Sequence, residues 1–226
     1  MSRSARSIAN REAARLEPLE LSTAVETLKG MKGAGFDESV DLHVNLNIDP
    51  RQAEEQLRAT LSLPHGTGRK VRIAVIAEGD DAIAAENAGA DLVGSESLVK
   101  EIQGGRMDFD VLLAAPTLMR ILAPLGRVLG PRGLMPSPKA GTVTTDLGPA
   151  VEAFSKGKQS FRNDAGGNIH LRVGKRSFSK EQLVQNVETA LSTVMGMRPS
   201  AVKGAFIKSV TIASTMGPGI RIAGSW

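Results

Sequence analysis

The clearest hydrophobic pattern in this chain is a strict alternation between residues 40 and 48. Every second residue is apolar and the residues between them are polar, the apolar positions being Val40, Leu42, Val44, Leu46 and Ile48. A period of two places alternate side chains on opposite faces of an extended strand. The alternation therefore predicts a strand with one buried and one polar face.

The last third of the chain also contains half-buried strands, which lie before and after a long amphipathic helix. Ile169, Leu171 and Val173 alternate with His170 and Arg172 and predict a second half-buried strand. A capping-box pair then predicts a helix start, followed by an apolar stripe: the pair is Ser179 and Gln182, and the stripe is Leu183, Val184, Val187, Ala190, Leu191 and Val194. A last strand is expected from about 205 to 213.

Near the N-terminus, Thr23 and Glu26 also have capping-box spacing. Val25, Leu28 and Met31 follow at helical spacing, so a helix is predicted from about Thr23 to Lys32.

The middle of the chain has a different pattern, in which short apolar segments alternate with helical ones. Strands are expected at 71–77, 91–93 and 111–115, and helices at 80–88, 96–103, 117–123 and near 149–154. Short apolar strands alternating with helices are typical of a parallel, Rossmann-like three-layer α/β arrangement.

These patterns predict two domains, of which one is split. Neither chain end has enough strands for an independent sheet, because two-stranded units are marginally stable. We therefore expect residues 1–66 and 159–226 to form one α+β domain, an α/β sandwich of both chain ends. Residues 67–158 would form an inserted Rossmann-like domain, which close chain termini make feasible.

The amino-acid composition excludes several classes of function. The chain has no cysteine, so thiol catalysis, disulfides and zinc ribbons are excluded. Its three histidines, His43, His65 and His170, are not at metal-site spacing, so no metal and no cofactor are expected. No apolar run approaches the ~20 residues of a membrane helix, and no membrane association is expected.

Charge is distributed unevenly. Residues 159–226 contain nine Lys and Arg against three Asp and Glu, which gives +6, whereas residues 67–158 contain eleven of each. Such a basic segment is typical of a surface that contacts phosphates. The first eleven residues carry Arg3, Arg6 and Arg11 without an acid, a composition found in RNA-contacting arms and in transit-peptide remnants.

No catalytic group of residues emerges. The glycine-rich stretch 66–70 precedes a strand instead of opening a helix, so it is interpreted as a connection and not as a phosphate loop. Residues 125–136, with three glycines and two prolines around Arg127 and Arg132, are expected to form an ordered exposed loop. The alternative is a nucleotide-dependent enzyme built on the middle domain, but the G-x-G-x-x-G fingerprint is missing.

Several ordered strings resemble the ribosomal protein L-one family over about residues 22–222. They are FDESVD (36–41), LPHGTG (63–68), LGPRGLMP (129–136), PKAGTV (138–143), FRND (161–164) and TMG (215–217). The resemblance implies a non-enzymatic constituent of the large ribosomal subunit, located on ribosomes of a bacterium or an organelle. It also implies an RNA-binding split domain.

The partners implied by this resemblance are large-subunit rRNA at the mobile stalk, exit-site tRNA whose release is assisted, and, in bacterial members, the protein's own mRNA, which is repressed. The protein would act as a monomer within the ribosome. The RNA contacts carried over from the family are Phe36, Glu38, Ser39, Arg162, Asn163, His170, Lys175, Lys208, Ser214, Thr215, Met216 and Gly217. Gly35 stands where the family usually has a basic residue, which predicts one phosphate contact fewer. A free translational repressor without a ribosomal role is a further alternative.

Overall fold

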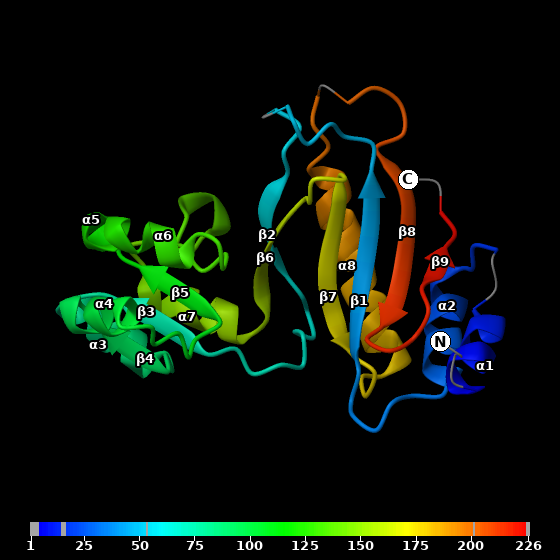
Figure 1. Cartoon of the computed structure of the whole chain (residues 1–226), viewed down its shortest axis with the longest axis horizontal. Coiled ribbons are helices and arrows are strands. Elements are labelled where there is room, and N and C mark those ends of the chain that lie inside the picture. The colour runs from blue at the N-terminus through cyan, green and yellow to red at the C-terminus, as the bar shows by residue number, and fades with distance from the viewer. Residues whose placement is uncertain (1–4, 15–16, 53, 201, 225–226) are drawn as a thin grey trace. The chain divides into compact units, whose positions relative to one another are not determined.

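The computed structural model describes residues 5–14, 17–52, 54–200 and 202–224, and Arg3 of the basic arm lies outside them. The fold is mixed α and β, with several sheets (Figure 1). The chain divides into two compact units. One contains Met1–Gly68 together with Phe161–Trp226, and the other contains Arg69–Ser160.

The first unit is built on a four-stranded antiparallel sheet in the order β7-β1-β8-β9. Its strands are β1 (Ser39–Leu46), β7 (Asn168–Lys175), β8 (Ile207–Ser214) and β9 (Ile220–Ile222). The strand predicted at 40–48 corresponds to β1, which begins one residue earlier and ends two residues earlier than expected, and the strands predicted in the last third correspond to β7 and β8. Strand β8 begins two residues later and ends one residue later than expected.

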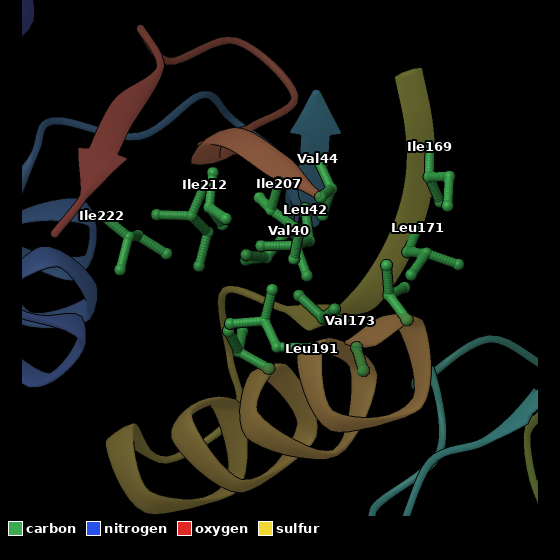
Figure 2. Close-up of a cluster of buried hydrophobic side chains, with 14 of the residues drawn as sticks. Val40, Leu42, Val44, Ile169, Leu171, Val173, Leu191, Ile207, Ile212 and Ile222 are labelled. Carbon is green, nitrogen blue, oxygen red and sulfur yellow. The ribbon is translucent and has the colours of Figure 1, made fainter. Parts of the chain in front are cut away.

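The apolar faces of these strands pack together as their alternation predicts. Val40, Leu42 and Val44 are fully buried. Leu42 lies opposite Leu171 and Ile212, and Val44 lies opposite Ile169 and Val210. Figure 2 shows them gathered with Ile169, Leu171, Val173, Ile207 and Ile212 above Leu191 of helix α8 (Lys180–Gly196). Burying each such side chain stabilises the fold by about 1.5–3 kcal/mol.

Helix α8 starts as its sequence predicts. The Ser179 hydroxyl accepts a hydrogen bond from the Gln182 amide at 3.2 Å, and the Gln182 side chain accepts one from the Ser179 amide at 3.0 Å. The apolar stripe is buried, apart from Val184, which is partly buried.

The predicted capping box at Thr23 and Glu26 is wrong. Helix α2 (Leu21–Gly30) begins two residues earlier, after Glu20, without a side-chain cap. Thr23 lies inside the helix, where its carbonyl accepts a hydrogen bond from the Thr27 hydroxyl at 2.8 Å. Tertiary packing of Ala24, Val25 and Leu28 fixes the helix position, and it outweighs the local capping signal. A further helix, α1 (Ala5–Ala13), precedes α2.

The second unit contains a three-stranded parallel sheet in the order β4-β3-β5. Its strands are β3 (Ile73–Ile76), β4 (Leu92–Gly94) and β5 (Val111–Ala114), and its longer helices are α3 (Asp80–Asn87), α4 (Glu96–Gln103) and α7 (Leu147–Ser155). Strands and helices alternate along the chain as predicted. The stretch from Gly66 to Lys70 leads into β3 and contains no helix, so it does not have phosphate-loop geometry.

One helix of this unit differs from its prediction. The helix expected at 117–123 is broken into short pieces, the 3-10 turns Pro116–Leu118 and Ala123–Leu125 and the single α-turn α5 (Met119–Leu122). Pro116 and Pro124 each stand in the first turn of a 3-10 segment, since proline lacks the amide hydrogen that a continuous helix needs. The expected loop of residues 125–136 includes another short helix, α6 (Gly126–Leu129).

Three short strands were missed. Strands β2 (Arg58–Ser62) and β6 (Lys158–Arg162) form a two-stranded sheet, and β9 joins the edge of the four-stranded sheet. They have three to five residues, and β2 and β6 are rich in charged or polar side chains. Such segments lack a hydrophobic period long enough to recognise, and only pairing with a partner makes them strands.

Candidate nucleic-acid interface

Eight of the twelve sequence-predicted contact residues lie at or next to one end of the four-stranded sheet. The register places Ser39 opposite Lys175 and Val40 opposite Ser214. The Ser39 amide donates to the Thr215 hydroxyl at 3.0 Å, and the Thr215 amide donates to the Ser39 carbonyl at 3.0 Å. These reciprocal bonds join segments that are 176 residues apart in the chain.

Glu38 organises this end of the sheet from inside the protein. Its side chain is buried, with the residue 1% exposed, and its carboxylate accepts hydrogen bonds from the amides of Ala34 at 2.5 Å and Met216 at 3.3 Å. Arg176 lies 3.7 Å from it. The carboxylate thus ties the loop before β1 to the turn after β8. Its burial suits it to hold these two backbones, and its predicted direct RNA contact stays a prediction.

Opposing effects act on the pKa of Glu38. Burial by itself raises this pKa, because a buried carboxylate loses hydration. Hydrogen bonds from the Ser214 hydroxyl and from the amides of Ala34 and Met216, with the charge of Arg176, outweigh burial and lower the pKa. The carboxylate is therefore ionised at neutral pH, which strengthens its hydrogen bonds to the backbone.

The turn after β8 exposes a compact surface beside this carboxylate. The Gly217 amide donates to the Ser214 carbonyl at 3.0 Å, and a Cβ at Gly217 would lie 2.5 Å from the Ser214 hydroxyl oxygen. Only glycine therefore fits this turn as it stands. Phe36 and Met216 are each 55% exposed, which is unusual for large apolar side chains and leaves them available for a base or another flat apolar group.

Asp37 and Arg176 belong to this end of the sheet, although sequence reasoning did not single them out. Asp37 accepts hydrogen bonds from the Ser177 amide at 3.1 Å and hydroxyl at 2.9 Å and lies 3.6 Å from Lys175. The Ser177 hydroxyl is the largest of the effects that lower the pKa of Asp37. Asp37 lies within the FDESVD string and Arg176 follows Lys175. Their partners are far away in the chain, so no local sequence pattern could predict these contacts.

A second group of predicted residues lies around a pocket elsewhere in the same unit. Arg162, Asn163 and His170 line an open cavity of about 650 Å³, together with Arg58 of β2. The Asn163 side chain is engaged with the backbone, accepting from the Leu57 amide at 2.8 Å and donating to the Asp164 carbonyl at 3.1 Å. Arg58, Arg162 and His170 are exposed, so their polar groups are accessible to a ligand.

Asp164 fixes the turn beside this pocket. Hydrogen bonds from the amide and side chain of Asn168, and then the Gly166 amide, lower the pKa of Asp164 to about 2. His170 Nε2 lies 3.4 Å from the same carboxylate.

Lys208 belongs to neither group, since it lies far along β8 from Ser214 and does not line the pocket. It is exposed near the start of β8, where the neighbouring Ile207 pairs with Leu46, whereas Ser214 lies at the opposite end of that strand. The structure thus places the twelve predicted residues at three places on one unit.

The residues that the structure describes contain no group of three or more potential metal ligands. Within the same part of the chain, no helix is long and apolar enough to cross a bilayer.

Comparison with known proteins identifies the chain's relatives. Residues 28–218 match the family described as Ribosomal protein L1p/L10e family. The chain is 50% identical over 209 residues to the large ribosomal subunit protein uL1 of Thermosipho melanesiensis, covering 92% of this chain and 90% of that protein. The protein of the same name from Kosmotoga olearia is 50% identical over 208 residues, with coverage of 92% and 90%. That from Prochlorococcus marinus is 49% identical over 205 residues, with coverage of 91% and 86%.

These relatives are structural proteins and not enzymes, so the nucleotide-dependent-enzyme alternative is set aside. A match over more than half of the chain, with relatives of about 50% identity along nearly its whole length, settles the family. The chain belongs to the Ribosomal protein L1p/L10e family.

Proposed function

We propose that this chain is a structural constituent of the large ribosomal subunit and binds large-subunit rRNA at the mobile stalk. In this proposal the unit of both chain ends is the RNA-binding domain, and residues 69–160 form an inserted Rossmann-like domain. The protein acts as a monomer on the ribosome. The names of the relatives support the ribosomal assignment.

The observation that carries the proposal is the joined end of β1 and β8. The Ser39–Thr215 hydrogen bonds and the Glu38 carboxylate hold the backbone of this region, while Phe36 and Met216 remain exposed. RNA is recognised through unstacked bases, 2′-hydroxyls and phosphates. The two exposed apolar side chains provide a contact surface for a base at the same end of the sheet as Lys175, which lies opposite Ser39.

Binding to a transcript of the large-subunit rRNA stalk tests the proposal. Phe36→Ala should weaken affinity by about fivefold or more, because stacking of an aromatic ring on a base is worth about 1–3 kcal/mol. Met216→Ala should also weaken affinity, because it removes an exposed apolar contact. Met195→Ala is the matched control, since Met195 is 44% exposed but lies on α8. Equal affinity of all three variants would contradict the proposed interface.

A second experiment assigns the affinity to one of the two units. A chain in which residues 69–158 are deleted and the ends joined should keep much of the binding. It should also keep a salt dependence that reports several released counterions. If the isolated middle segment held the affinity, the assignment to the split unit would be wrong.

We further propose that the protein assists release of exit-site tRNA and represses translation of its own mRNA through an RNA fold similar to the rRNA site. The basic segment of residues 159–226 supports contacts with more than one RNA. Sedimentation with large subunits separates the ribosomal role from that of a free repressor. In vitro translation of the protein's own mRNA, with and without added protein, tests repression.

A further inference from the structure

Two of the three histidines in the chain face each other across neighbouring strands. The β1–β7 register places His43 opposite His170, and their Nδ1 atoms are 2.8 Å apart. The ring centroids are 5.0 Å apart, with the ring planes at 67°. Both side chains extend from the polar face of the sheet, because Leu42, Val44, Ile169 and Leu171 occupy the buried face.

The hydrogen-bond partners define which nitrogens carry hydrogens. Asp164 is ionised at neutral pH, so it accepts a hydrogen from Nε2 of His170, 3.4 Å away. With that hydrogen on Nε2, Nδ1 of His170 can act as the acceptor, and Nδ1 of His43 is then the donor in the contact between the rings. Nε2 of His43 is left as the nitrogen that can take up a further proton.

The charged groups around the pair have both signs. On β1, Asp41 raises the pKa of His43, and on β7 Arg172 lies 3.5 Å from Asp41. The turn between β6 and β7 contributes Asp164, and Arg58 and Arg162 line the pocket that His170 also lines. Strand β8 places the uncharged Thr211 opposite His43.

Burial, and then the charge of His170, lower the pKa of His43 below its ordinary value, against the opposing effect of Asp41. In the free protein at neutral pH His43 is therefore neutral. A phosphate placed beside the ring would favour the charged form and raise this pKa.

We propose that His43 and His170 form a proton-dependent phosphate subsite of the RNA interface, at which binding of an RNA phosphate is coupled to uptake of one proton by the pair. The inference rests on the proposed RNA-binding function. His43 is thereby added to the interface, with Arg58 and Arg162, which line the pocket together with His170, supplying permanent positive charge.

The sign of the coupling follows from linkage. If bound phosphate raises the pKa of His43, the complex holds more protons than the free protein, and affinity increases as pH falls. Each pKa unit of increase strengthens binding up to tenfold at low pH. We expect the full-length protein to bind the rRNA stalk transcript about threefold to tenfold more tightly at pH 6 than at pH 8, at constant salt.

Histidine variants test the assignment. His43→Gln should flatten the pH dependence, because a glutamine cannot take up the proton. His65→Gln is the matched control, since His65 hydrogen-bonds to Gln185 of α8 and lies outside the pair. His43→Lys should bind at pH 8 nearly as tightly as the unchanged protein binds at pH 6, a gain that a purely structural histidine would not give.

Calorimetry of RNA binding at pH 6.5, in two buffers of different ionisation enthalpy, counts the protons directly. Net uptake of up to one proton is expected, and it should be lost in His43→Gln but kept in His65→Gln. If RNA binds with the same pH dependence in all variants, the subsite is refuted and the RNA-binding function stands. If the unchanged protein binds the transcript at neither pH, the proposed function itself fails.

Discussion

Removing the Glu38 carboxylate should destabilise the end of the sheet on which the candidate interface is built. Glu38→Ala leaves the amides of Ala34 and Met216 without their acceptor and leaves the partly buried Arg176 without its counter-charge. A hydrogen bond to a charged group is worth about 1.5–3 kcal/mol, and water can reach the exposed Met216 side after truncation. We expect Glu38→Ala to lower the free energy of unfolding of this unit by about 3 kcal/mol. Glu38→Gln keeps one acceptor oxygen and should cost about half as much.

Native-state hydrogen exchange of the β1 amides is the suitable assay, because it reports on the first unit even if the two units unfold separately. Glu188→Ala, at an exposed position of α8, is the matched control and should change stability by less than about 0.5 kcal/mol. The affinity for the stalk transcript should fall in Glu38→Gln as well, since the Met216 backbone loses an anchor. A β1 opening free energy in Glu38→Ala equal to that of the control would refute this reasoning.

Two further predictions concern the surroundings of the interface. Asn186 is fully buried and donates hydrogen bonds to the carbonyls of Gly66 and Val173. Asn186→Ala should therefore lower the free energy of unfolding by about 2–4 kcal/mol. Urea denaturation measures this change, with Ser192→Ala, at an exposed position, as the control. Because the pKa of Asp164 is lowered from 3.8 to about 2, its stabilising effect is present above pH 3.8 and is lost as pH falls through about 2. The urea midpoints of the unchanged protein and Asp164→Asn should therefore differ at pH 5 and converge near pH 2, and a constant difference would contradict this origin.

Long periodic segments were predictable from the sequence, because the period of their apolar residues indicates both the type of element and the face that is buried. The alternation at 40–48 became β1, and the capping box at Ser179 became the start of α8. Prediction failed where a local signal competed with packing, as at Thr23, or where a strand was too short to show a period, as in β9.

The candidate interface was predictable in residue type and only partly in arrangement. Motif resemblance supplied Ser39, Thr215 and Met216, but it could not show that Glu38 is buried and holds the backbones on either side. Resemblance also could not show that Lys208 lies away from Ser39. Strand pairing places the end of β8 near Ser39, whereas Lys208 lies near the start of β8.

The sequence by itself determined the long periodic elements of this protein, such as β1, β7 and α8, and which face of each is apolar, since these follow from periodicity and capping within a few residues. Only the tertiary structure decided which polar residues become neighbours. Register and strand order place His43 against His170 and Ser39 against Thr215, across 127 and 176 residues of chain. Those pairings depend on the simultaneous burial of all the apolar faces, which no single segment specifies.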